Sequence, residues 1–181
     1  MTLKQLQNLI DVRILSKRLL LVPISVKYKE NIFREFTSEI TKYMSPTPPK
    51  NISDTEKFIT DSLKTLNDGS NLQLVILDKE SAEFLGNIGL HEIQSKHPEF
   101  GIWLKKSAHG NGFGREAITA LKSWTDKNLN YEYILYPVVA ENIPSRKIPE
   151  SLGGKIFREY DEKIQGGNLH HFVEFRIYPN K

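Results

Sequence analysis

The sequence predicts an α+β fold in which helices flank one central mixed, mostly antiparallel sheet. Three observations support this prediction. The apolar residues change from helical spacing to strand-like runs in the middle of the chain, short turns join three successive strand candidates there, and a nearly unbroken apolar strand follows an amphipathic helix. Since 181 residues are enough to bury a sizeable core, we expect a single domain over residues 1–181.

The first part of the chain predicts one strand among helices. Residues 3–10 carry leucines at helical spacing, which favours a short leading helix. The apolar run 18–24 predicts the first strand, and helical spacing then recurs over residues 25–43 until a proline-rich stretch. The next helix is expected to open at a capping box, Ser53-Asp-Thr-Glu56, and to stop at Asn67-Asp-Gly69.

The middle of the chain predicts three antiparallel strands in succession. Their expected ranges are 72–77, 84–93 and 99–104. Turn-forming residues at 78–81 and 95–98 separate them. Short turns of this kind place consecutive strands side by side in a sheet.

The last part of the chain alternates helices and strands. One apolar stripe predicts an amphipathic helix over residues 115–129. The apolar run 133–139 is typical of a strand covered on both faces. A helix over 142–152 and a final hairpin of strands 155–160 and 172–177 complete the prediction.

The composition excludes several classes of protein. The chain has 39% hydrophobic residues and a net charge of only +3, which argues against disorder and against a nucleic-acid surface. It has no cysteine, which excludes disulfides, thiolate zinc sites and thiol catalysis. No apolar run approaches the roughly 20 residues that span a bilayer, and no signal peptide is visible, so we expect a cytoplasmic protein without a membrane contact. His170 and His171 point to opposite faces of one strand, so we expect no metal site.

The most informative segment is a glycine-rich turn between a strand and a helix. Gly110, Gly112 and Gly114 alternate there, and free N–H groups at the start of a helix make a site for phosphate. Arg115 stands where the dinucleotide fingerprint needs glycine or alanine, and the Gly-Lys-Ser/Thr of a P-loop is missing. A flexible turn that caps a helix is the alternative.

Two motif regions in this order resemble the GNAT superfamily of acetyl-CoA-dependent N-acetyltransferases. They read His109-x-x-Gly112-x-Gly114, then Asn142-x-x-Ser145 with Glu150-x-Leu152-Gly153. Residues 18–23, 39–44 and 84–89 resemble its RimJ/RimL-like branch, which acetylates ribosomal-protein N-termini, and the resemblance spans about residues 16–178. Three positions depart from the family pattern: His109, Pro149 and Gly154.

The resemblance implies a GNAT-like domain that takes acetyl-CoA as a cosubstrate, with its pyrophosphate on the backbone amides of the turn. Lys105, Lys106 and Arg115 flank this turn and add positive charge for phosphate, although solubility alone also explains such residues. The expected coenzyme-binding residues are Trp103, Leu104, His109, Gly110, Asn111, Gly112, Phe113, Gly114, Arg115 and Asn142.

Acetyl transfer to an amine needs a base for the amine, a donor for the oxyanion and an acid for the thiolate. By resemblance, a bulged or splayed strand around Trp103 and Leu104 offers the oxyanion donor. Ser145 is the expected acid, with Asn142 orienting the site, and a helix N-cap is the alternative role of Ser145. Glu99 is the first candidate base.

Further groups remain open as proton acceptors. Glu92 and Asp161 are alternative bases, and His91 is a possible relay. An α-amine with a pKa of about 8 needs less help from a base than a lysine at about 10.4.

The sequence therefore predicts an N-acetyltransferase that moves acetyl directly from acetyl-CoA to a primary amine in a ternary complex. The acceptor is a protein N-terminus or a small molecule, and residues 26–68 are expected to hold its specificity. A non-catalytic acyl-CoA-binding or regulatory module is the alternative, and a nucleotide-binding protein is a third interpretation. We expect a monomer or homodimer.

Overall fold

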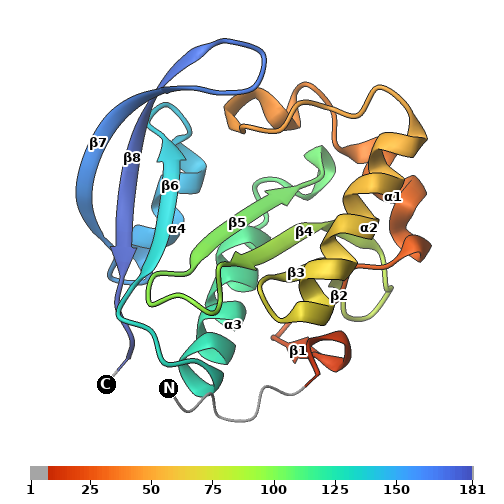
Figure 1. Cartoon of the computed structure of the whole chain (residues 1–181), viewed down its shortest axis with the longest axis horizontal. Helices are drawn as coiled ribbons and strands as arrows, with labels where there is room; N and C mark the ends of the chain where they lie inside the picture. The colour runs from red at the N-terminus through yellow and green to blue at the C-terminus, as the bar shows by residue number, and fades with distance from the viewer. Residues whose placement is uncertain (1–7, 181) are drawn as a thin grey trace.

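The computed structural model describes residues 8–180, and its centre is one mixed sheet of eight strands (Figure 1). The sheet order is β1-β2-β3-β4-β5-β6-β8-β7, and only the pair β5 and β6 is parallel. This confirms the predicted fold class. The strands are β1 (Ile14–Leu15), β2 (Leu19–Pro23), β3 (Leu72–Asp78), β4 (Phe84–His91), β5 (Glu99–Leu104), β6 (Ile134–Val139), β7 (Lys155–Lys163) and β8 (Leu169–Ile177).

Helices cover both faces of this sheet. The first two α-helices lie over one face and the last two over the other (Figure 1). The α-helices are α1 (Lys29–Glu35), α2 (Ile52–Asp68), α3 (Phe113–Asn128) and α4 (Ile143–Ser151). Four short 3₁₀ turns are η1 (Leu9–Asp11), η2 (Val26–Tyr28), η3 (Ile40–Tyr43) and η4 (Lys106–Ala108).

The predicted strands are all present, but the helix expected over residues 25–43 is wrong. It is divided into η2, α1 and η3, and α1 ends before Phe36. Thr37 begins a separate turn, in which its backbone carbonyl accepts from the Thr41 N–H. Serine and threonine favour such turns because their hydroxyls compete for backbone groups.

Two other local predictions change. The capping box of α2 is formed by Asn51 and Asp54, two residues before the predicted one, because the Asn51 amide rather than Ser53 accepts from the N3 backbone N–H. The leading helix predicted over residues 3–10 falls mostly on residues 1–7, which lie outside the described residues.

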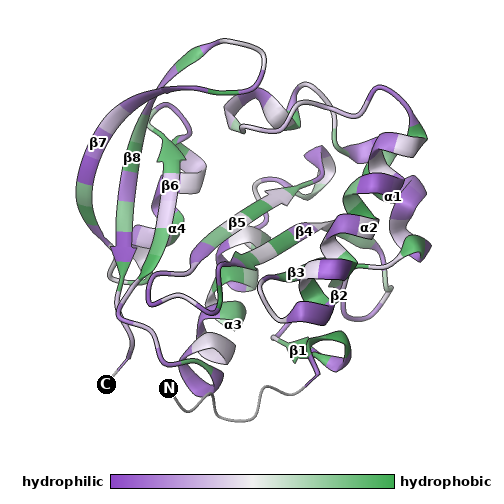
Figure 2. Cartoon of the chain, viewed as in Figure 1, coloured by the Kyte–Doolittle hydropathy of each residue, from purple (hydrophilic) through white to green (hydrophobic). Residues whose placement is uncertain are grey.

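The apolar faces of these elements form a continuous core. Figure 2 shows hydrophobic residues along the central strands and hydrophilic residues on the outer sides of the helices. Leu74, Ile76, Ile88 and Leu90 on β3 and β4 are completely buried. Within residues 8–180, no helix is long and apolar enough to cross a membrane.

The sheet opens between its two middle strands. β5 and β6 pair only at Glu99 and Leu135, where the Leu135 N–H donates to the Pro98 carbonyl at 2.8 Å. Beyond this point the strands diverge, which gives the sheet two wings, β1–β5 and β6–β8 (Figure 1). We call the point where the wings meet the vertex, and the space between the strands the gap.

Candidate active site

The glycine turn follows the end of β5 and leads directly into α3. Gly110 and Gly112 have φ of 78° and 74°, in the left-handed region that favours glycine. Gly112 is the N-cap of α3 and offers no side chain to its first turn. The first N–H groups of a helix have no partner within it, so those of α3 are available to an anion at this turn.

The space around the turn is also open. A Cβ atom at Gly110 would meet nothing within 4 Å, and one at Gly112 would meet only the Arg18 guanidinium, at 3.7 Å. Gly114 has a different role, because a Cβ there would lie 3.3 Å from Ile148 of α4. The first two glycines therefore shape the turn, and the third lets α3 and α4 approach each other.

Two side chains predicted for the coenzyme brace the turn from inside. The His109 ring hydrogen-bonds the Leu104 carbonyl at 2.9 Å. The Asn111 amide donates to the carbonyls of Ala108 and His109 at 3.3 and 3.0 Å. These contacts hold the shape of the backbone that is expected to face the coenzyme.

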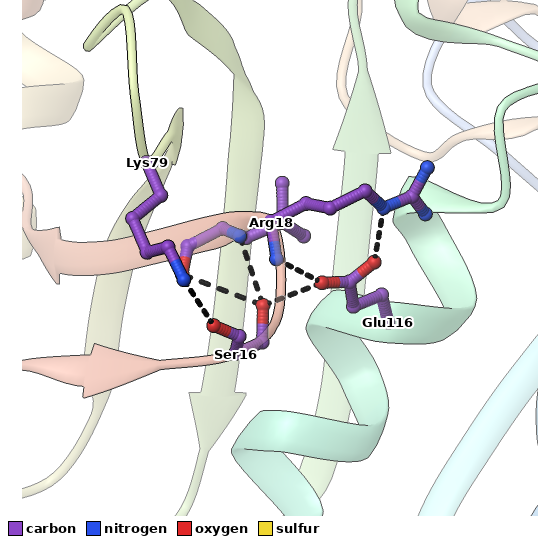
Figure 3. Close-up of polar contacts among 5 residues, drawn as sticks. Ser16, Arg18, Lys79 and Glu116 are labelled. Carbon is purple, nitrogen blue, oxygen red and sulfur yellow. Dashed lines mark hydrogen bonds and ion pairs between the residues drawn. The ribbon is translucent and has the colours of Figure 1, made fainter.

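A network that the sequence analysis did not find anchors the start of α3 (Figure 3). The Glu116 carboxylate accepts from the Ser16 hydroxyl at 2.8 Å, and from the backbone N–H and the guanidinium of Arg18 at 2.7 Å each. Burial opposes the ionisation of Glu116, but these hydrogen bonds outweigh it and lower the pKa of the carboxyl. The Arg18 guanidinium also lies 4.5 Å from the centre of the Phe113 ring. Arg18 lies in the motif at residues 18–23, which the sequence analysis noted. Its partner Glu116 lies 98 residues later in the chain, so the sequence did not reveal the contact.

A basic groove of about 720 Å³ lies beside the turn. It is lined by Arg13, Arg18, Arg115 and Lys127 among others, with Glu116 as its carboxylate. Arg115 is exposed and belongs to none of the ion pairs formed by residues 8–180. Its five N–H donors match a phosphate group.

The backbone of β5 points alternately to β4 and into the gap. The N–H of Lys105, which directly follows β5, donates to the carbonyl of Leu85 on β4, so the N–H of Trp103, two residues earlier, also points toward β4. The N–H groups of Ile102 and Leu104 point toward the gap. Of the two predicted strand residues, Leu104 thus presents its backbone to the gap, whereas the Trp103 side chain packs on Phe36 with a ring separation of 4.8 Å.

Glu99 lies at the vertex. Burial, together with the negative charges of Glu92, Glu174 and Glu162, raises the pKa of this carboxyl to about 7. The other two candidate bases are placed differently, since Glu92 is exposed on the turn after β4 and Asp161 is exposed and hydrogen-bonded to His171. Of the three candidate bases, Glu99 is the one that lies where the sheet opens, and its pKa is close to neutral pH.

His91 is the cross-strand neighbour of Glu99. Its ring lies over a pair of glycines, because a Cβ at Gly89 or Gly101 would be 2.8 or 3.2 Å from its Nε2 atom. Burial lowers the pKa of His91, although the charge of Glu92 opposes this shift. Burial therefore favours the neutral form of the ring.

Ser145 lies in the first turn of α4 and contacts β6. Its hydroxyl is 2.9 Å from the Tyr136 hydroxyl, and its backbone N–H donates to the Asn142 side chain at 3.4 Å. Burial raises the pKa of Tyr136 to about 12, although the bond to Ser145 opposes this, so the phenol stays protonated. Asn142, not Ser145, is the N-cap of α4, and the alternative role of Ser145 as the cap is therefore wrong.

Of the two departures near the end of α4, the structure explains Gly154. Pro149 lies inside the helix. A Cβ at Gly154 would lie 2.7 Å from the Pro149 carbonyl oxygen, so a residue with a side chain does not fit there without movement.

A second cavity, of about 290 Å³, lies on the face of the sheet that α1 and α2 cover. We call it the acceptor-side cavity. Its walls are mostly apolar, and its floor includes Gly89, His91 and Gly101 beside the vertex. The proline-rich segment 44–49 forms part of its wall, although no ligand chemistry could be read from that segment in the sequence.

The histidine pair does not form a metal site with its neighbours. His171 hydrogen-bonds Asp161 and Glu159 at 2.7 and 2.9 Å, and these bonds raise the pKa of His171. In the part of the chain that the structure describes, no cluster of three or more histidine or acidic residues has a geometry suited to a metal ion.

Comparison with known proteins gives a consistent result. The family described as "Acetyltransferase (GNAT) domain" matches residues 18–155. The chain is 32% identical over 137 residues to an uncharacterized N-acetyltransferase, p20, of Bacillus licheniformis, a match that covers 71% of this chain and 74% of that protein.

Solved structures share the fold at lower identity. A RimL ribosomal L7/L12 alpha-N-protein acetyltransferase in complex with coenzyme A is 15% identical, with a TM-score of 0.83, and the match covers 92% of this chain and 98% of that one. A spermidine N-acetyltransferase from Vibrio cholerae, in complex with CoA and spermine, is 20% identical, with a TM-score of 0.78 and coverage of 90% and 96%.

Proposed function

The chain belongs to the GNAT family of acetyltransferases, and on this premise we propose that it transfers acetyl from acetyl-CoA directly to a primary amine within a ternary complex. The observation that carries the proposal is the placement of Glu99. A carboxyl with a pKa of about 7 lies at the vertex, between the acceptor-side cavity and the gap that leads to the glycine turn. A base of this strength suits an amine that must lose a proton near neutral pH.

The glycine turn fits the pyrophosphate of the coenzyme. We assign the pyrophosphate to the first N–H groups of α3 and to the Arg115 guanidinium, which lies free beside them. The thioester is assigned to the gap, where the backbone N–H groups of Ile102 and Leu104 are aimed. A developing oxyanion is stabilised by donors that are fixed before the reaction.

The chemistry then needs two proton transfers. Glu99 accepts a proton from the acceptor amine, the amine nitrogen forms a bond to the acetyl carbon, and the carbon–sulfur bond breaks. Ser145 gives its proton to the departing thiolate, and the Tyr136 hydroxyl, 2.9 Å away, orients it. Solvent then returns a proton to Ser145 and takes the one held by Glu99, which restores both groups. No residue of the chain needs to carry the acetyl group.

Acceptor-dependent release of the coenzyme A thiol tests this function. We expect thiol release from acetyl-CoA with at least one member of a panel of peptide N-termini, amino acid amides and polyamines. Double-reciprocal plots at several amine concentrations should intersect. Parallel lines, or an acetylated protein formed without acceptor, would contradict direct transfer.

The same experiment distinguishes an acetyltransferase from a non-catalytic module. A non-catalytic acyl-CoA-binding module binds acetyl-CoA but releases no thiol with any amine of the panel. A single domain, a monomer or homodimer, and a cytoplasmic location remain part of the proposal, and size-exclusion chromatography with light scattering measures the oligomeric state.

A further inference from the structure

Two buried polar groups in the acceptor-side cavity have no hydrogen-bond partner among residues 8–180. They are the Asn87 amide, of which neither the oxygen nor the nitrogen is bonded, and the Thr55 hydroxyl. Asn87 is 1% exposed and Thr55 is 2% exposed. Buried polar side chains are nearly always hydrogen-bonded, so two unpaired groups in one cavity are free to bond a molecule that enters it.

The strand pairing explains why Asn87 is unpaired. Its cross-strand neighbours are Val75 on β3, whose side chain has no polar atom, and Trp103 on β5, whose indole N–H does not bond it. Residues directly opposite in adjacent strands share a face of the sheet, so the Asn87 amide lies between an aliphatic and an aromatic side chain and bonds neither. Leucine in place of Asn87 would suit this position in the free protein better.

The charges around the cavity restrict the ligand. No lysine or arginine of residues 8–180 lines it, so a carboxylate would be buried beside none of these cations. Its one acidic residue among those described, Asp54, is exposed and accepts from the backbone N–H groups of Lys50 and Asn51 at 2.8 and 3.2 Å, so solvent screens its charge and an ammonium group gains little there. An amide and a hydroxyl both donate and accept, and so does a neutral amide.

We propose that Asn87 and Thr55 select the acceptor by bonding a neutral amide group that it carries near its reactive amine. This inference rests on the proposed function. The amine lies toward Glu99 at the vertex, and the amide reaches along β4 into the acceptor-side cavity. The substrate class is an α-amino amide, and its source is a free amino acid amide or the first peptide unit of a protein N-terminus.

The test compares acceptors with and without the amide in matched variants. Leucinamide, a Leu-Ala-Ala peptide amide and 3-methylbutylamine share an amine and an isobutyl group, but only the first two carry an amide. We expect Asn87→Leu to lower kcat/KM by about 10–100-fold for the two amides and to leave 3-methylbutylamine within about 2-fold. For each acceptor, the kcat/KM of the wild type is divided by that of the variant. The acceptors differ in amine pKa, and this ratio removes the effect of that difference.

Thermal stability distinguishes a ligand-binding role of Asn87 and Thr55 from a structural role, because replacing a residue that stabilises the fold lowers the Tm. Asn87→Leu should raise the Tm by a few degrees, because it removes an unpaired buried amide. Thr55→Val should not lower the Tm and should weaken the preference for amides. Thr125→Val is the matched control, since the Thr125 hydroxyl is also buried in a helix but donates to the Leu121 carbonyl at 2.8 Å. It should lower the Tm and leave the acceptor preference intact.

Binding of the three acceptors to the protein–CoA complex, measured by calorimetry, separates the two proposals. Amide-selective binding that Asn87→Leu abolishes, without any thiol release, would refute the acetyl transfer and support the amide site. Equal loss of kcat/KM for all three acceptors, or a lowered Tm with an unchanged preference for amides, would overturn the amide site.

Discussion

The glycine turn and the acceptor-side cavity are built in opposite ways. The turn uses consecutive residues, and its expected ligand contacts are backbone N–H groups exposed by Gly110 and Gly112. The cavity collects side chains from α1, segment 44–49, α2 and three strands. A site made of backbone depends little on which side chains surround it, whereas a site made of side chains changes with each of them.

This difference predicts which property of the protein a substitution in each region changes. A change in the turn should alter coenzyme binding for every acceptor alike. A change in the cavity should alter the choice of acceptor and leave the coenzyme dissociation constant unchanged. Glu99 and Ser145 are the proposed base and acid, and there we expect the largest losses of rate.

The first prediction concerns Glu99. Glu99→Gln should lower kcat/KM by about 10²–10⁴-fold for every acceptor, because it removes the base, while the acetyl-CoA dissociation constant stays unchanged. In the wild type, kcat/KM should rise with pH through about 7, since the base must be ionised, and the variant should lose this limb. Glu92→Gln is the control, and it should keep both the rate and the limb.

The pH dependence of stability tests the raised pKa of Glu99 independently of turnover. The pKa of Glu99 is raised from 4.5 to about 7, so the folded state binds the proton more tightly than the unfolded state. Its contribution to stability is complete below pH 4.5 and is lost as the pH rises through about 7. Urea midpoints of Glu99→Gln should therefore fall less between pH 5 and pH 8 than those of the wild type, and parallel curves would show that the pKa is not raised.

The second prediction separates two hydroxyls. Ser145→Ala and Tyr136→Phe each break the same 2.9 Å hydrogen bond, so their losses of stability should be similar, about 1 kcal/mol. Only the first removes the proposed acid. We expect kcat to fall about 100-fold in Ser145→Ala and less than 10-fold in Tyr136→Phe, with unchanged acetyl-CoA affinity. The reverse order would make Tyr136 the acid.

The third prediction tests the turn. Arg115→Ala should raise the acetyl-CoA dissociation constant about 5–10-fold and make it less sensitive to salt, because one charged contact to phosphate is lost. The Tm should not change, since Arg115 is exposed and forms no ion pair among residues 8–180. Lys127→Ala, in the same groove, is the control with an expected effect below 2-fold. An acceptor-dependent effect of Arg115→Ala would break the distinction between the two regions.

The smallest expected effect is at the cap of α4. Asn142→Ala should cost about 0.5–1 kcal/mol of unfolding free energy, because the Asn142 side chain accepts only a long bond from the Ser145 N–H. Asn142→Ser keeps a capping oxygen and should recover most of that loss in urea titrations. A loss of kcat as large as that of Ser145→Ala, without a change in stability, would give Asn142 a direct catalytic role.

The sequence by itself determined the fold class, every long strand and the glycine turn. These features depend on local patterns, namely the alternation of apolar residues, turn residues between strands, and glycines before an amphipathic helix. The motif at residues 109–114 could be identified because all of its groups are adjacent in the chain. The prediction of one helix over residues 25–43 was wrong, because the apolar spacing over these 19 residues did not reveal the turn that begins at Thr37.

Only the tertiary structure decided how the distant segments meet. Glu99 was a candidate from its position, but its raised pKa depends on burial and on Glu162 and Glu174, which come from the far wing of the sheet. The Arg18–Glu116 anchor and the unpaired Asn87 likewise depend on strand order and register. Burial and Coulomb interactions depend on distances in space, and a sequence lists its residues only by distance along the chain.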